Sequence, residues 1–393
     1  MKHAIMIGTL SSVAYLLCYV ARNILSVMSP GILATTDIDE AVIGLLSTVN
    51  MWSYAGGQLI NGIIGDKIKG KYLISIGLAF AGICNICMGM SESRIVMLVA
   101  YGMMGFFLSM LYAPLTKLIA ENTHPKYTVN CCLGLTLASL IGVPVAGIAA
   151  LFFEWYSAFI ICGLVLVAMG IGFYLSVLAF EKRGIVKYCT AIKNKQKGGS
   201  LKVLIEREII RFSFISILTG VVRTSVTFWV PTYLSQRLGY SLTIAATIYT
   251  VTTCVRSVAP YVGNLIIYQR LLRKNQYSTL ILAFSGSAIS FLLMFIVKTP
   301  LLNIVFLTLA LMAESVASNL LWTIYCPSLY DTGMVSSATG YLDFLSYASA
   351  GVANLIFANA ITAIGWDKLI LVWAALMGAG VLVSVPFKRK RLT

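Results

Sequence analysis

Twelve long apolar segments are the feature that most constrains the fold of this 393-residue chain. A helix of about 20 apolar residues spans the hydrocarbon core of a bilayer. With 59% hydrophobic and 11% charged residues, the chain carries more apolar surface than a soluble domain needs. The sequence therefore predicts an all-α integral membrane protein with twelve transmembrane helices. The segments lie at roughly 4–33, 41–65, 72–91, 95–120, 127–152, 155–180, 209–236, 242–266, 277–298, 301–328, 334–362 and 368–387.

The positive charge of the chain is distributed unevenly between the two sides of these segments. The formal net charge is +15, and with a cytoplasmic N-terminus 22 of the 29 Lys and Arg residues lie inside and four lie outside. Loops rich in Lys and Arg stay on the cytoplasmic side of a membrane. We therefore expect a monomeric multi-pass protein of the cell membrane with both termini cytoplasmic. Its expected partners are a small anionic substrate and the lipid bilayer, not nucleic acid.

A polar segment at 181–208 divides the chain into 1–180 and 209–393, and it includes the sequence KNKQKGGS. The two parts share a pattern, R-x7-P-x2-L, at 22–33 and 223–234, with an offset of 201 residues. Because six helices intervene, both copies run in the same direction across the membrane. This pattern predicts a parallel repeat of two pseudo-symmetric six-helix bundles, 1–180 and 209–393, joined by a cytoplasmic linker at 181–208.

The loop after the second segment, GIIGDKIKGK at 62–71, resembles the G-x-x-x-D-[RK]-x-x-x-[RK] loop of the major facilitator superfamily. The resemblance implies the fold of that superfamily and a cytoplasmic gating latch. The latch residues would be Gly62, Asp66, Lys67 and Lys71. The same letters also spell part of a P-loop, but no strand precedes them and Tyr72 replaces Ser or Thr, which excludes that motif.

Two arginines, Arg22 and Arg223, occupy equivalent places in the repeat, each inside an apolar segment. A charge at membrane depth costs at least about 2.5–3.5 kcal/mol and normally faces a cavity or a partner. Guanidinium groups bind carboxylate or phosphate through two parallel hydrogen bonds. We therefore expect both arginines to face one central pathway and to bind an anion, in preference to purely structural salt bridges.

The residues around both arginines resemble those of the organophosphate:phosphate antiporters of this superfamily. That family carries Y-x3-Y-x2-R-x7-P and R-x5-W-x-P-T-Y at these places. The matching residues here are Tyr15, Tyr19, Arg22 and Pro30, then Arg223, Trp229, Pro231, Thr232 and Tyr233. The resemblance implies that the two arginines bind phosphate, and that a rocker-switch motion exchanges an organic phosphate for inorganic phosphate.

Three positions depart from that family. Asn23 and Gln58 stand where lysines are common, and Leu137 stands where a histidine is common. The candidate substrate-binding site therefore keeps its arginines but loses much of the surrounding basicity. Its candidate residues are Arg22, Arg223, Tyr19, Asn23, Trp229 and Gln58.

Three further charges lie at membrane depth in the second half: Arg256, Glu314 and Asp343. One interpretation is an internal ion pair between Arg256 and a carboxylate. The other is that a carboxylate binds a proton or a cationic group of the substrate, because burial favours the neutral form of a carboxyl group. The sequence leaves both interpretations open.

The pattern as a whole predicts a transporter of a small organic anion. The substrate that it favours is a phosphorylated metabolite, exchanged for inorganic phosphate. Two alternatives remain: a proton-coupled carrier of a carboxylate or zwitterion, and a transporter-like nutrient sensor, which the short linker and tail disfavour. With two histidines and few carboxylates we expect no metal site, no cofactor and no enzymatic activity.

Overall fold

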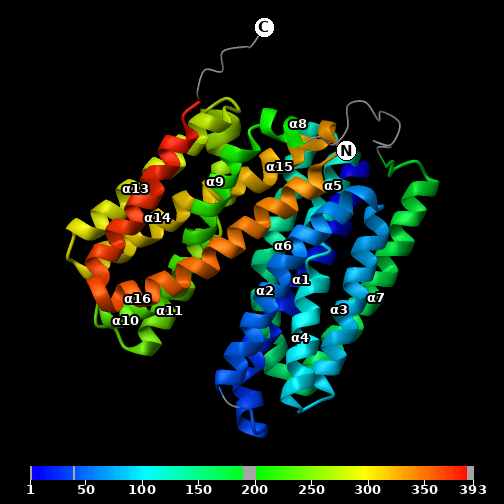
Figure 1. Cartoon of the computed structure of the whole chain (residues 1–393), viewed down its shortest axis with the longest axis horizontal. Coiled ribbons are helices and arrows are strands. Elements are labelled where there is room, and N and C mark those ends of the chain that lie inside the picture. Colours follow the sequence, from blue (N-terminus) through cyan, green and yellow to red (C-terminus); the bar gives the residue numbers. More distant parts are fainter. Residues whose placement is uncertain (1, 39, 189–200, 387–393) are drawn as a thin grey trace. The chain divides into compact units, whose positions relative to one another are not determined.

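The structure, a computed structural model, describes residues 2–38, 40–188 and 201–386. The described residues are helical, joined by short turns. They form two compact units (Figure 1). Unit 1 comprises Met1–Arg207 and Tyr325–Phe344, and unit 2 comprises Glu208–Ile324 and Leu345–Thr393.

Unit 1 is built mainly from seven successive helices, in which α1 packs on α6, α2 on α4 and α3 on α7. Their bounds are α1 Lys2–Thr35, α2 Glu40–Lys67, α3 Gly70–Gly89, α4 Arg94–Leu108, α5 Tyr112–Asn122, α6 Pro125–Phe152 and α7 Trp155–Lys182. The short helices α8 Leu201–Glu206, α15 Cys326–Ser328 and η4 Leu329–Thr332 also belong to this unit, together with the first turns of α16 (Val335–Ser384).

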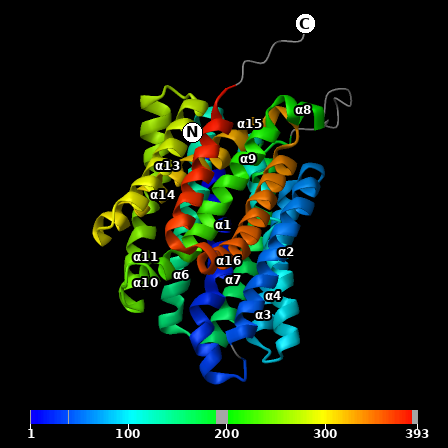
Figure 2. The same cartoon turned by 60° about the vertical axis from the view of Figure 1, so that its left-hand side comes forward.

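Unit 2 contains longer helices interrupted by π-helical turns, and in both views α13 lies beside α14 (Figures 1 and 2). Its elements are α9 Ile209–Gly220, η1 Val221–Val226, α10 Thr227–Gln236, α11 Leu242–Arg256, α12 Ala259–Tyr261, η2 Val262–Leu271, α13 Gln276–Ile296, α14 Pro300–Leu320, η3 Leu321–Tyr325 and the remainder of α16.

The prediction of an all-α membrane fold is confirmed, and each of the twelve apolar segments is helical. Among the described residues, nine helical stretches are long and apolar enough to cross a membrane by length and composition. The other three predicted segments are α2, the run from α11 to η2, and the first part of α16. Part of the predicted linker, 189–200, and the basic tail at 388–391 lie outside the described residues.

The last two predicted segments join end to end in α16 and meet at Gly365. Its φ of +76° and ψ of 171° lie in a region that only glycine adopts readily, so the chain bends there. The side chains after the bend tie it to the end of α10 in unit 2. Trp366 Nε1 donates to Gln236 Oε1 at 3.3 Å, and Asp367 pairs with Arg237 at 2.9 Å.

Within unit 1, the first turns of α16 cross α2 at close range through two glycines. A Cβ on Gly62 would lie 2.9 Å from Ser336 O and 3.0 Å from Gly340 Cα. A Cβ on Gly340 would overlap the backbone oxygen of Gln58. Small residues allow two helix backbones to approach this closely in a membrane, so packing rather than flexing is the role that the geometry supports at Gly340.

Substitution of Gly340 by Ala should destabilise unit 1, because the added methyl group has backbone on its far side and cannot be accommodated by a rotamer change. We expect a loss of about 1–3 kcal/mol, the usual cost of overpacking. Gly378→Ala in the same helix is the matched control, since no atom lies within 4 Å of its Cβ position. Thermal unfolding in detergent should rank G340A below both wild type and G378A, and equal melting temperatures would refute the close crossing.

Candidate functional site

Asp66, near the end of α2, binds the start of α16 within unit 1. Its Oδ1 accepts a hydrogen bond from Ser336 N at 3.0 Å, and its Oδ2 accepts one from Ser337 N at 2.7 Å. These amides belong to the first turn of a helix, where N–H groups lack helical partners and the helix dipole favours a negative charge. Lys117 of α5 adds an ion pair with Asp66 at 3.6 Å. Asp66 therefore ties the end of α2 to the first turn of α16 and to α5.

The two lysines assigned to this latch have other surroundings. Lys71 Nζ pairs with Glu181 of α7 at 2.5 Å, so it ties α3 to α7. Lys67 is exposed at the end of α2. The basic partner of Asp66 is instead Lys117, which also donates to the backbone oxygens of Gly65 and Asp66 at 3.0 and 3.1 Å.

Arg22 of α1 lies among tyrosines of unit 1. Its guanidinium carbon is 4.3 Å from the centre of the Tyr54 ring and 5.9 Å from that of Tyr19. Tyr101 of α4 donates its hydroxyl to Arg22 O at 3.2 Å. Cation–π contacts hold a guanidinium by the face of its plane and do not use up its N–H donors. Such surroundings orient the plane of the Arg22 guanidinium.

The two candidate amides, Asn23 and Gln58, differ in their surroundings. Asn23 Nδ2 donates to Tyr19 O of its own helix at 2.7 Å. Gln58 is fully buried on α2, and neither its Nε2 nor its Oε1 has a hydrogen-bond partner among the described residues. A buried amide without partners costs about 1–3 kcal/mol for each unsatisfied group. The buried amide of Gln58 therefore makes the packing of α2 against α16 less stable.

Arg223 stands on the π-helical turn η1 of unit 2, a kind of turn that is frequent at functional sites. Its Nη2 donates to Ser346 Oγ of α16 at 3.1 Å. Its guanidinium carbon lies 5.8 Å from the Trp322 ring and 5.6 Å from the Tyr347 ring. Aromatic rings thus lie around Arg223 as they do around Arg22, and Arg223 also interacts electrostatically with Glu314. Trp229, its predicted companion, is half-buried on α10.

Arg256 and Glu314 form an ion pair in unit 2. Arg256 Nη2 lies 2.7 Å from Glu314 Oε2, and the two side chains are 12% and 0% exposed. This distance agrees with the interpretation of an internal pair. The second candidate carboxylate, Asp343, is buried on α16 among residues that belong to unit 1.

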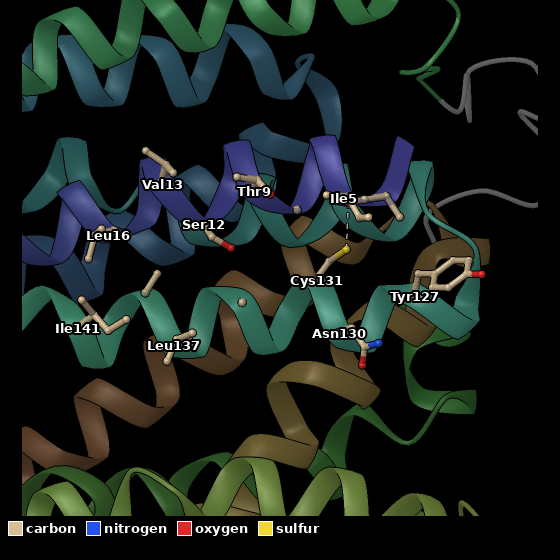
Figure 3. Close-up of a pocket in the computed structure, with 14 residues that line it drawn as sticks. Ile5, Thr9, Ser12, Val13, Leu16, Tyr127, Asn130, Cys131, Leu137 and Ile141 are labelled. Carbon is tan, nitrogen blue, oxygen red and sulfur yellow. Dashed lines mark hydrogen bonds between the residues drawn. The ribbon is translucent and has the colours of Figure 1, made fainter. Parts of the chain in front are cut away.

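A groove of about 570 Å³ runs between α1 and α6 in unit 1 (Figure 3). Cys131 bridges it with a hydrogen bond from Sγ to Ala4 O at 3.4 Å. Its lining residues are apolar or neutral, and Leu137 is among them. With leucine in place of the histidine common in the resembled family, the groove wall supplies no charge for an anion.

The sequence did not indicate several residues that the structure brings to these charges. Lys117 and Glu181 come from elements far from Asp66 and Lys71 in the sequence, and Trp322 and Ser346 are as distant from Arg223. No spacing rule connects such residues. The strongest available signal was the indole of Trp322 inside an apolar segment.

The family is decided by a match of residues 11–354 to the model of the Major Facilitator Superfamily. The chain belongs to the Major Facilitator Superfamily. The predicted resemblance to this superfamily is therefore confirmed, and the protein is a multi-pass membrane protein of the transporter type. No part of the match tests the individual candidate residues.

Some of the similar proteins are named as transporters and some as sensors. The Escherichia coli (strain K12) "Membrane sensor protein UhpC" is 24% identical over 398 residues, 95% of this chain and 89% of the relative. A "Probable hexose phosphate transport protein" of Chlamydia pneumoniae is 26% identical over 109 residues, 28% of this chain and 24% of the relative. The "Probable sulfoacetate transporter SauU" of Cupriavidus necator is 21% identical over 397 residues, 94% and 90% of the two chains.

Two solved structures share the fold of this chain over nearly its whole length. The Escherichia coli fucose:proton symporter FucP gives a TM-score of 0.77 at 14% identity, covering 98% of each chain. The human organic anion transporter MFSD10 gives a TM-score of 0.75 at 12% identity, covering 97% of this chain and 99% of the other. At these identities the likeness shows the fold alone.

Replacing Asp66 by Asn should loosen the first turn of α16, because the neutral amide accepts more weakly from Ser336 and Ser337 and loses the pair with Lys117. A hydrogen bond to a charged group contributes about 1.5–3 kcal/mol, so amide exchange in this turn should quicken about tenfold or more. Hydrogen–deuterium exchange on the peptide that contains the turn measures this.

Asp331→Asn is the control, because Asp331 pairs with Arg207 just before α16 while 41% exposed. An exposed pair of this kind contributes little, so D331N should exchange as the wild type does. Equal protection of the turn in D66N and D331N would show that Asp66 does not hold it.

Proposed function

We propose that this protein exchanges a phosphorylated metabolite for inorganic phosphate across the cell membrane by rocker-switch alternating access. The observation that carries the proposal is the placement of Arg22 and Arg223 at equivalent positions of the repeat, each in its own unit. Both guanidiniums lie over aromatic rings, with Tyr54 and Tyr19 around one and Trp322 and Tyr347 around the other.

The chemistry of this setting favours a phosphate group. Aromatic faces stabilise a cation without neutralising its formal charge, so both guanidiniums still attract an anion. Each guanidinium presents a planar fork of donors that matches two phosphate oxygens, and two forks together suit a dianion better than a carboxylate. The names of the similar proteins include hexose phosphate and sulfoacetate, both anions, which supports an anionic substrate.

We place both termini on the cytoplasmic side. The basis is the distribution of Lys and Arg along the sequence, since 22 of the 29 fall on one side of the predicted helices. Labelling of a single introduced cysteine in the polar segment 181–208, with a reagent that does not cross membranes, tests this orientation in intact cells. Labelling from the outside would overturn it.

A proton-coupled carrier of a carboxylate is the second candidate. It is favoured by Asn23 and Gln58, which remove positive charge that the organophosphate antiporters commonly have, and by the buried carboxyl of Asp343. Proteoliposomes that contain no phosphate distinguish the two candidates. Uptake driven by a pH gradient alone supports proton coupling, and uptake that requires internal phosphate supports exchange.

A sensor is the third candidate, because the relative that matches 95% of this chain is named a membrane sensor protein. A sensor needs to bind its ligand but not to move it. Counterflow of labelled phosphate into phosphate-loaded proteoliposomes therefore separates the two functions. Binding without counterflow would favour the sensor over the exchanger.

Replacing Arg22 or Arg223 by Ala should abolish phosphate exchange while leaving the protein in the membrane. Loss of a charge-assisted hydrogen bond costs about 1.5–3 kcal/mol each, so loss of a two-bond contact should lower exchange at least tenfold. Initial rates of labelled phosphate exchange in proteoliposomes, normalised to the amount of inserted protein, measure the effect.

Arg237→Ala is the matched control, because this arginine lies in an exposed pair with Asp367 in unit 2. Its rate should stay close to that of the wild type. Exchange that persists in both R22A and R223A would end the proposal that these arginines bind the transported anion.

A further inference from the structure

The groove between α1 and α6 of unit 1 has no role in the proposed function. Its volume is about 570 Å³, and its lining residues run from Ala4 to Leu16 on α1 and from Tyr127 to Ile141 on α6 (Figure 3). At about 1.5 Å per residue these stretches are about 18 and 21 Å long. The hydrocarbon core of a bilayer is about 30 Å thick, so each leaflet contributes about 15 Å. The groove is therefore long enough to hold one acyl chain over the full depth of a leaflet.

The residues that line the groove give it the shape of a channel open along one side. Its buried lining residues are small and include Ala4, Gly8 and Ala138. Ile5 and Leu137, which also line it, are 57% and 44% exposed. An acyl chain gains no hydrophobic energy by moving from the bilayer to such a channel, since both are apolar. It does gain van der Waals contacts on more sides than a flat helix surface offers, so packing favours its binding.

Basic side chains lie at one end of the groove, where both helices begin. Ile5 and Tyr127 lie together at this end (Figure 3), close to the first residues of α1 and α6. The exposed basic residues of the two helix starts are Lys2, His3, His124 and Lys126. The N-terminus of a helix also carries a partial positive charge, so the dipoles of α1 and α6 add to the charge of the two lysines. The opposite end of the groove, at Leu16 and Ile141, is apolar.

The two stretches of chain along the groove contain no acidic residue. Neither 2–16 nor 123–141 includes Asp or Glu. Glu121 of α5, which precedes the second stretch, interacts electrostatically with Lys117 and Asp66. A positively charged end and a long apolar channel therefore match the two parts of an anionic phospholipid, its phosphate and its acyl chain.

We propose that the groove is a binding site for an anionic phospholipid, with one acyl chain between α1 and α6 and the headgroup at Lys2 and Lys126. A zwitterionic lipid has the acyl chain but no net charge for the two lysines. With the N-terminus cytoplasmic, this end of the groove faces the leaflet in which anionic lipids attract basic residues next to the membrane. The site does not involve the transported anion, so its test does not depend on the proposed function.

Native mass spectrometry of the full-length protein, purified in detergent, tests this directly. The protein is mixed with equal amounts of phosphatidylglycerol and phosphatidylcholine that carry identical acyl chains, and the amounts of the two lipid complexes are compared. Each Lys near the headgroup strengthens binding of an anionic lipid by about fivefold. Wild type should therefore bind phosphatidylglycerol at least tenfold better than phosphatidylcholine, and equal binding would overturn the inference.

Changing Lys2→Gln and Lys126→Gln together tests the headgroup end. This double variant should lower the preference for phosphatidylglycerol to within about threefold, because it removes both charges and leaves the groove intact. The matched control changes Lys182→Gln and Lys187→Gln, two exposed lysines of unit 1 near the end of α7, and should keep the wild-type preference. Equal preferences in the two double variants would contradict the proposed position of the headgroup.

Thr9→Trp tests the acyl-chain channel, because Thr9 is exposed and lines the groove, so an indole there fills it. Binding of both lipids should fall at least tenfold. Ile171→Trp is the matched control, since Ile171 is 57% exposed on α7, outside the groove, and this variant should bind lipid as the wild type does. Leu137→Trp fills the groove from the other helix and decides the question if T9W does not fold.

Two results would overturn the occupant that we propose. T9W and L137W proteins that bind both lipids as I171W does would show that no acyl chain lies in the groove. A lipid-free dimer in the wild type that is lost in T9W and L137W would show that a second copy of this chain covers the groove instead.

Discussion

The cost of a charge at membrane depth is the constraint on which this structure depends. Water is absent from the hydrocarbon region, so each charged side chain there must find donors, acceptors or an opposite charge within the protein. The structure meets this requirement in several ways. Arg256 is bonded at all three nitrogens and neutralised by Glu314, whereas Arg22 and Arg223 lie over aromatic rings that leave their formal charge in place.

The same need for partners applies to the buried charge at the crossing of α2 and α16 in unit 1. The Asp66 carboxylate is satisfied by two helix N-terminal amides and by Lys117, and the glycines Gly62 and Gly340 allow the backbones to approach. Gln58, directly beside this crossing, is buried with both polar atoms unsatisfied. Favourable and unfavourable contributions to stability therefore meet at one place.

The sequence predicted the fold well because hydropathy and the positive-inside bias act locally and are strong in membrane proteins. The assignment of the individual helices followed from the same signals, whereas the bend at Gly365 was seen only in the structure. Contacts between distant segments could not be predicted in this way. The loop motif indicated Asp66 and Lys71 but not Lys117 or Glu181, because pairing depends on how α3, α5 and α7 pack. For Arg256 the sequence left two interpretations open, and only the 2.7 Å distance to Glu314 favours one of them. The roles of Arg22 and Arg223 in binding stay predictions.

The central claim is that Arg22 and Arg223, on two repeat-related helices, bind one and the same phosphate group. A double-mutant cycle on the dissociation constant of inorganic phosphate tests it most directly, using R22K, R223K and the double variant to keep each charge but remove each planar fork. Residues that share a ligand are coupled by about 0.5–3 kcal/mol, whereas independent sites add within about 0.3–0.5 kcal/mol. We predict a coupling of at least about 1 kcal/mol. Strict additivity, with each arginine acting on phosphate alone, would contradict the account.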